Sequence, residues 1–184
     1  MSNQKQNIGK GGSGLQAGRD INIYSVLRNP SILADVVNEI SKINLDDESI
    51  YGLIKEAPQI EEKILHNNIK VHRYLIDDYQ IYGKELENIY KTLEQLNPGR
   101  KGKLFRVISD FYKKEKGILT IDNNIELIRQ NADSILGNVI EKLENEILKS
   151  SNLNAQNEDI KTSISIIVAD SFIRCKILED PNEL

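Results

Sequence analysis

Histidine and cysteine, whose side chains often act as nucleophiles, bases or metal ligands, are few in this 184-residue chain, and they are widely spaced. His66 and His72 are six residues apart, so the two rings do not share a helix face as a zinc-binding pair would. Cys175 is the only cysteine, and its neighbours Arg174 and Lys176 point elsewhere on a helix. We therefore expect surface histidines, a buried cysteine that behaves as a small apolar residue, and no enzyme, metal or cofactor.

Among the glycine-rich and acidic stretches of the sequence, one residue, Asp170, suggests a specific role. The GKGGSG run near the N-terminus lacks the preceding strand and the final Gly-Lys-Ser/Thr of a phosphate-binding loop. The adjacent Asp77 and Asp78 are expected to face water. Asp170 lies inside the most apolar run of the sequence, and a buried carboxylate needs a partner. Asp170 is therefore either a structural hydrogen-bond centre or an interface contact.

A basic patch lies between residues 100 and 116, in a chain whose formal net charge is -4. Only Asp110 and Glu115 oppose the basic residues there. These basic residues are Arg100, Lys101, Lys103, Arg106, Lys113, Lys114 and Lys116. Such a patch could contact nucleic-acid phosphates or an acidic partner, or it could be a solvated helix surface. The acidic balance of the whole chain predicts weak or no direct DNA binding.

The N-terminal region, residues 1–27, differs in pattern from the rest of the chain. A glycine-rich, polar stretch changes into an alternating, β-prone one, with a fairly apolar side and a polar side. A lone strand is unstable in water, so this arm is either a tail or pairs with a partner edge or another copy. The residues predicted to mediate self-association are Leu15, Gln16, Ala17, Gly18, Arg19, Asp20, Ile21 and Ile23.

The second domain, residues 28–184, carries apolar residues at helical spacing and predicts an all-α, multi-helix bundle. Helices are expected to begin at Asn29-Pro30 and at Asp46-Asp47, and to cover residues 104–116 and 157–179. One long helix should run from about residue 59 to residue 96, and another should follow the capping sequence at 123–126. Residues 157–179 are apolar on nearly all sides, which predicts a central helix. Leu96 and Val107 are expected to face the core.

Two stretches of the bundle resemble a known family. They are YLIDDYQIYGKELENIYKTLEQL, residues 74–96, and ISIIVADSFIRCKILEDPNE, residues 164–183. From about Ile69 onward the chain resembles the C-terminal helical domain of bacterial ABC-three-component systems, which act in anti-phage defence and are related to the Lamassu group. The arm sequence GSGLQAGRDINIY is similar in style to bacterial amyloid-signalling motifs, with Leu15, Gln16, Ala17 and Gly18 as the core unit.

The resemblance implies an SMC-like ABC ATPase and an effector subunit as partners. In that family the helical domain normally follows an enzymatic effector domain, whereas only the arm and one or two helices precede it here. The expected function is therefore a non-enzymatic assembly or recruitment subunit that docks through its bundle and forms a homo-oligomer through its arm. A small DNA-binding accessory protein using the 100–116 patch is the alternative. No signal peptide or membrane-spanning run is visible, so a cytoplasmic protein without membrane contact is expected.

Overall fold

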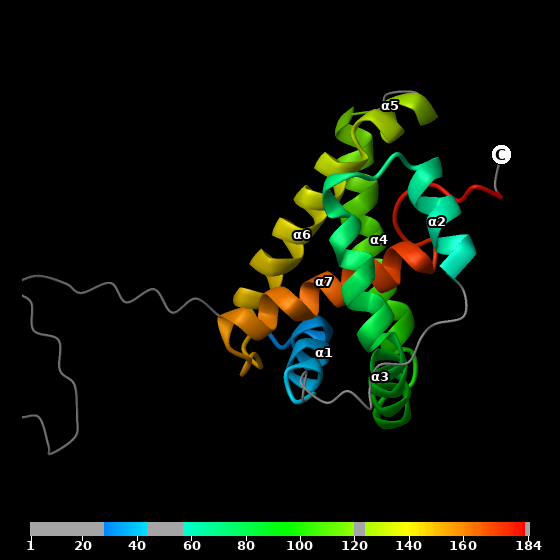
Figure 1. The fold of residues 1–184 in the computed structure, drawn as a ribbon. Helices are drawn as coiled ribbons and strands as arrows, with labels where there is room; N and C mark the ends of the chain where they lie inside the picture. Colours follow the sequence, from blue (N-terminus) through cyan, green and yellow to red (C-terminus); the bar gives the residue numbers. More distant parts are fainter. Residues whose placement is uncertain (1–27, 44–56, 120–123, 183–184) are drawn as a thin grey trace, which may run out of the picture.

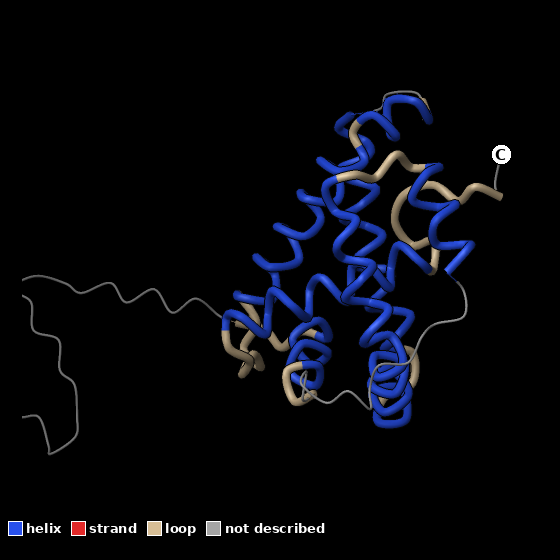
Figure 2. The backbone as a smooth tube through the Cα atoms, in the orientation of Figure 1, coloured by secondary structure: helices blue, strands red, loops and turns tan. Residues whose placement is uncertain are grey.

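The computed structural model describes residues 28–43, 57–119 and 124–182. The predicted β-prone arm and the helix expected after Asp46 lie outside these ranges. Helices account for all the regular secondary structure within them, which confirms the all-α prediction (Figure 2). In chain order the helices are α1 (Ile32–Ile40), α2 (Ala57–His66), the 3-10 helix η2 (Val71–Arg73), α3 (Tyr74–Leu96), α4 (Arg100–Leu119), α5 (Ile125–Gln130), α6 (Ala132–Leu148) and α7 (Asn157–Ile173).

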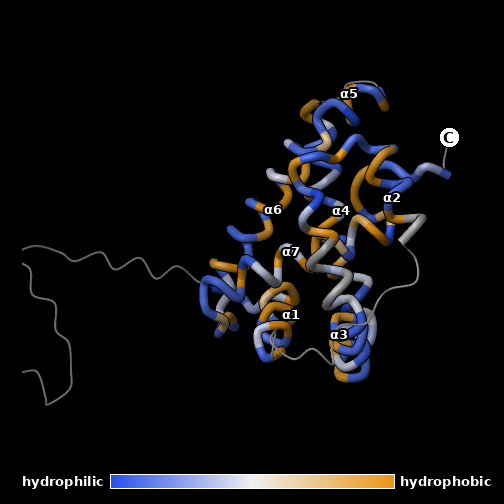
Figure 3. The backbone as a smooth tube through the Cα atoms, viewed as in Figure 1, coloured by the Kyte–Doolittle hydropathy of each residue, from blue (hydrophilic) through white to orange (hydrophobic). Residues whose placement is uncertain are grey.

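The centre of the bundle is α7, which crosses it with α3, α6 and α1 packed against it (Figure 1). Its residues from Ile166 to Phe172 are all buried, as the apolar run predicts. The other long helices bury one stripe each, so hydrophobic and hydrophilic residues alternate along them (Figure 3). Within the described residues, no helix is long and apolar enough to cross a membrane.

The prediction of a single long helix from residue 59 to residue 96 is wrong, because the chain turns after α2. Asn68 takes a left-handed conformation with φ of 54°. The N–H of Asn68 donates to the Leu65 carbonyl, and the N–H of Ile69 donates to the Ile64 carbonyl. This is a Schellman motif, which ends a helix and which asparagine tolerates. Ile69 is thereby buried in the core before η2 and α3 begin.

The last helix is also shorter than expected, because α7 ends at Ile173 and the chain folds back over α2 and α4. Leu178 has a φ of 60° and is buried, as is Ile177 before it. The Asn67 side chain donates to the Glu179 carbonyl (2.9 Å) and accepts from the Glu179 N–H (2.9 Å). The Tyr112 hydroxyl donates to the Glu179 carboxylate at 2.5 Å. We call residues 174–182, held in this way, the C-terminal clasp.

Three finer expectations also differ from the structure. Leu96 and Val107 are exposed, by 70% and 40%, although both were expected to face the core. Leu96 is the last residue of α3, beyond the packed part of that helix. Asn124 caps α5 by accepting from two backbone N–H groups, and a break at Asn131 separates α5 from α6 where one helix was expected. Helix α4 is longer than predicted, at Arg100–Leu119.

Candidate functional site

The basic residues between 100 and 116 fall into two groups, according to whether their side chains form ion pairs with other described residues. Three of its side chains lie in ion pairs with distant parts of the chain. Arg100 pairs with Asp35, Lys101 with Glu87 (3.0 Å), and Lys116 with Glu179 (2.8 Å). These contacts fasten α4 to α1, to α3 and to the C-terminal clasp, so these three residues support the fold.

The other basic side chains of the patch stay open to solvent. Lys103, Arg106, Lys113 and Lys114 are exposed and form no ion pair with any other described residue. Two of them share a helix face with apolar residues, because spacings of three and four residues line up on a helix. This α4 stripe consists of Lys103, Val107, Phe111, Lys114 and Ile118.

A groove with a volume of about 450 Å³ lies between α4 and α6 beside this stripe. Three lysines, one glutamate and one asparagine surround a half-buried phenylalanine in it. The residues of this α4–α6 groove are Phe111, Lys114, Lys142, Asn145, Glu146 and Lys149. Sequence reasoning missed the contribution of α6, although residues 142, 145 and 149 have the spacing of one helix face.

A buried carboxylate positions one wall of the groove. Glu115 is 4% exposed and accepts hydrogen bonds from Lys142 and from the Asn138 amide (2.7 Å). The hydrogen bond from Lys142 lowers the pKa of Glu115, and the hydrogen bond from Asn138 lowers it further. Together they outweigh burial, which acts to raise this pKa. Glu115 therefore stays ionised and fixes the Lys142 ammonium at the edge of the groove.

Asp170 is a structural hydrogen-bond centre, which confirms the first of the two expectations for it. It is fully buried, accepts from the Tyr90 hydroxyl at 3.0 Å and pairs with Arg174 at 2.9 Å. Arg174 in turn pairs with Glu87 at 2.6 Å. Burial raises the pKa of Asp170, while Arg174 acts to lower it. We call Glu87, Tyr90, Asp170 and Arg174 the α3–α7 network.

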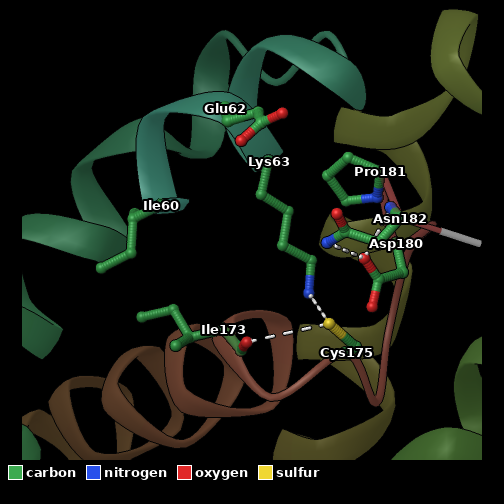
Figure 4. Close-up of a pocket in the computed structure, with 8 residues that line it drawn as sticks. All are labelled: Ile60, Glu62, Lys63, Ile173, Cys175, Asp180, Pro181 and Asn182. Atoms are coloured by element: carbon green, nitrogen blue, oxygen red, sulfur yellow. Dashed lines mark hydrogen bonds between the residues drawn. The ribbon is translucent and has the colours of Figure 1, made fainter. Parts of the chain in front are cut away.

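Cys175 was expected to be buried, and this expectation is wrong. The residue is exposed, with a φ of 53°, because α7 has ended before it and the chain turns into the clasp. The Lys63 ammonium lies 2.8 Å from its sulfur, across a pocket of about 330 Å³ (Figure 4). Partial burial raises the pKa of the Cys175 thiol despite Lys63, so the ionised, nucleophilic form is not favoured.

The histidines have structural surroundings. Both are half-buried rather than fully on the surface. The His72 ring lies 3.2 Å from Asp133, whose carboxylate also accepts from the backbone N–H groups of residues 70, 71 and 72. No group of three or more His, Cys, Asp or Glu side chains that could hold a metal occurs among the described residues. The side chains of Asp77 and Asp78 lie outside the description.

These observations define a class of protein: an all-α bundle, joined internally by ion pairs, with an open basic groove on one face. The chain matches C-terminal domain 10 of the ABC-three-component systems over residues 31–179, and it belongs to that family. The match begins well before Ile69, so α1 and α2 are part of the same domain. No curated protein and no solved structure matches the chain.

The two stretches that carried the resemblance meet in the α3–α7 network. Glu87 and Tyr90 come from the first stretch, and Asp170 and Arg174 from the second. Contacts between them cross the most extensive helix–helix interface described in the bundle. The residues that make the sequence recognisable therefore hold the domain together, and they are distinct from those of the α4–α6 groove.

Proposed function

We propose that this protein is a non-enzymatic assembly or recruitment subunit of an ABC-three-component anti-phage system. The observation that carries this proposal is the family match, which spans every helix from α1 to α7 and most of the clasp. The proposed partners are an SMC-like ABC ATPase and an effector subunit. The proposed location is the cytoplasm, without membrane contact.

The chemistry of the described residues supports a binding role. The most strongly held polar groups, such as Asp170 and Glu179, are engaged with other parts of the same chain. The thiol of Cys175 has a raised pKa, which is the opposite of what a nucleophile requires. One surface that remains open to a partner is the α4–α6 groove.

The arm supplies the second half of the proposal. We propose residues 1–27 as a separate region that self-associates through Leu15 to Ile21 and Ile23, and residues 28–184 as the docking domain. Bringing arms together on folded bundles raises their local concentration, which favours strand pairing. Light scattering on the chain, on a 27–184 truncation and on Ile21→Asp/Ile23→Asp tests this. An unchanged oligomeric state in both variants contradicts self-association through the arm.

The assembly role is tested by co-expressing the full chain with the ABC ATPase and the effector of the same ABC-three-component system. We expect a stable complex with defined stoichiometry in size-exclusion chromatography with light scattering. Omitting this chain should prevent the ATPase and the effector from co-purifying. If both remain associated without it, or if neither binds it, the recruitment role is wrong.

The open basic side chains favour a second candidate, a small DNA-binding accessory protein. Charge reversal of Lys103, Arg106, Lys113 and Lys114 tests it, because these residues make no ion pair within the described part of the chain. Arg100 and Lys101 are unsuitable for this test, since they fasten α4 to α1 and α3. Tight, salt-dependent duplex binding that the reversal abolishes would favour this candidate over recruitment.

A further inference from the structure

We propose that the α4–α6 groove binds an acidic, amphipathic helix of a protein partner. This inference rests on the assembly role proposed above, and it names the surface and the chemistry through which that role is carried out. Two features of the groove support it: an apolar row along its α4 side and lysines on both walls.

The apolar row lies on the α4 stripe. Phe111 is half-buried in the groove, while Val107 and Ile118 on the same helix face are 40% and 73% exposed. Apolar side chains at such spacing are contacted by the apolar face of a helix lying in a groove. Phe111 is the natural anchor, because aromatic side chains in partly enclosed positions contribute most to protein–protein binding.

The lysines stand on both sides of the groove. Lys114 comes from α4, Lys142 comes from α6, and Lys149 is the residue that caps the C-terminal end of α6. Glu146 is the only acidic residue among those that line it. In a chain with net charge -4, this local excess of positive charge attracts a partner of opposite sign. Lys142 is already held in place by Glu115, which reduces the side-chain ordering that binding requires.

The same features argue against nucleic acid as the occupant. Val107, Phe111 and Ile118 alternate with the lysines, and apolar groups gain little beside phosphates. The arm of this chain does not complement the groove either. Residues 1–27 carry Lys5, Lys10 and Arg19 against Asp20, so their net charge has the same sign as the groove.

The groove can be tested directly with a peptide. The probe is a fluorescent synthetic amphipathic helix of glutamate and leucine, and its control is a peptide of the same composition in scrambled order. We expect the full chain to bind the helix at least tenfold more tightly than the scrambled peptide. The variant Lys114→Glu/Lys149→Glu should weaken binding at least tenfold, and Phe111→Ala should weaken it with an unchanged salt dependence.

The matched control is Lys91→Glu/Lys161→Glu, which makes the same charge change at exposed sites on α3 and α7. Circular dichroism of every variant verifies that the bundle is folded. Equal binding of the peptide by the groove variant, the control variant and the wild-type chain overturns the proposal. So does binding that Lys91→Glu/Lys161→Glu weakens as much as Lys114→Glu/Lys149→Glu does.

The native partners separate this inference from the assembly role. If the wild-type chain joins the ATPase–effector complex and Lys114→Glu/Lys149→Glu does not, both proposals are supported. If the groove variant joins as well as the wild type, the groove proposal fails and the assembly role stands. If the wild type does not join, the assembly role fails, and the peptide measurement alone decides the groove. Duplex DNA that competes with the peptide and binds more tightly assigns the groove to nucleic acid.

Discussion

The α3–α7 network and the α4–α6 groove are both rich in charged side chains, but those of the network pair with one another and most of those of the groove do not. In the α3–α7 network, Asp170, Arg174 and Glu87 form a continuous series of ion pairs that also receives the Tyr90 hydroxyl and Lys101. Among the described residues that line the α4–α6 groove, only Lys142 forms an ion pair with another described residue, and its partner Glu115 is buried. The first region satisfies its charges internally, while the second leaves them exposed to solvent.

This difference teaches that a cluster of charges in a sequence does not by itself indicate a binding site. The basic run from residue 100 to residue 116 looks uniform, but Arg100, Lys101 and Lys116 are paired with carboxylates far away in sequence. Substitutions in the α3–α7 network should therefore act mainly on stability. Substitutions of the open lysines should act mainly on binding.

The largest effect is expected for Asp170→Ala. Removing this carboxylate leaves the Arg174 guanidinium without its buried partner and the Tyr90 hydroxyl without its acceptor. Breaking one side of a buried ion pair costs about 3–5 kcal/mol. Urea denaturation should show a loss of that size, and Asp110→Ala, on the exposed side of α4, should change little. Equal stability of the two variants would mean that the network does not hold the bundle together.

Glu115→Gln tests the one ion pair of the α4–α6 groove that involves a buried carboxylate. The Lys142 and Asn138 donors face a charged group, and hydrogen bonds of this kind contribute about 1.5–3 kcal/mol each. Because the folded-state pKa of Glu115 lies below its unfolded value, its contribution is present above the usual value of about 4.3 and is lost as pH falls through the lowered pKa.

The matching measurement is the free energy of unfolding between neutral pH and pH 3. The wild type should lose stability across the acidic part of this range, and Glu115→Gln should lose less, since it no longer titrates there. Asp170 acts in the opposite direction, because its raised pKa favours the folded state on protonation. Parallel curves for the wild type and Glu115→Gln would show that Glu115 is not held ionised by Lys142.

A smaller effect is expected for the clasp variant Asn67→Ala. The Asn67 side chain is fully buried and is bonded to both backbone groups of Glu179. Its loss should cost about 1–3 kcal/mol, the penalty for buried polar groups left without partners. Asn88→Ala, at an exposed position on α3, is the control. Hydrogen exchange should show faster opening of α2 in Asn67→Ala, and protection equal to the wild type would contradict the clasp.

The sequence predicts local features of this fold well, because helical spacing is a local property. The buried face of α6 and the central position of α7 follow from apolar spacing, and the burial of Asp170 follows from its apolar neighbours. Contacts between distant segments do not follow. The Arg100–Asp35 pair joins residues 65 apart, and Lys63 reaches Cys175 across 112 residues.

The same limit explains which parts of the candidate site were missed. Lys103 and Lys114 were identified from charge alone, whereas Lys142 and Lys149 become part of the site only because α6 packs antiparallel beside α4. The end of α2 was missed for a different reason. The apolar spacing continues from Ile64 to Leu75, and only the left-handed turn at Asn68 reveals that two helices share it.

The smallest effect on stability is expected where the comparison is most informative, at Lys103→Glu/Lys114→Glu. Both side chains are exposed and neither makes an ion pair with a described residue, so their reversal removes no internal contact of that kind. Surface substitutions away from such contacts usually change stability by less than about 0.5 kcal/mol. Lys91→Glu is the single-charge reference. Urea denaturation of all three proteins should give nearly coincident midpoints. A loss approaching that of Asp170→Ala would show that these lysines support the fold, and the distinction between a closed network and an open face would then fail.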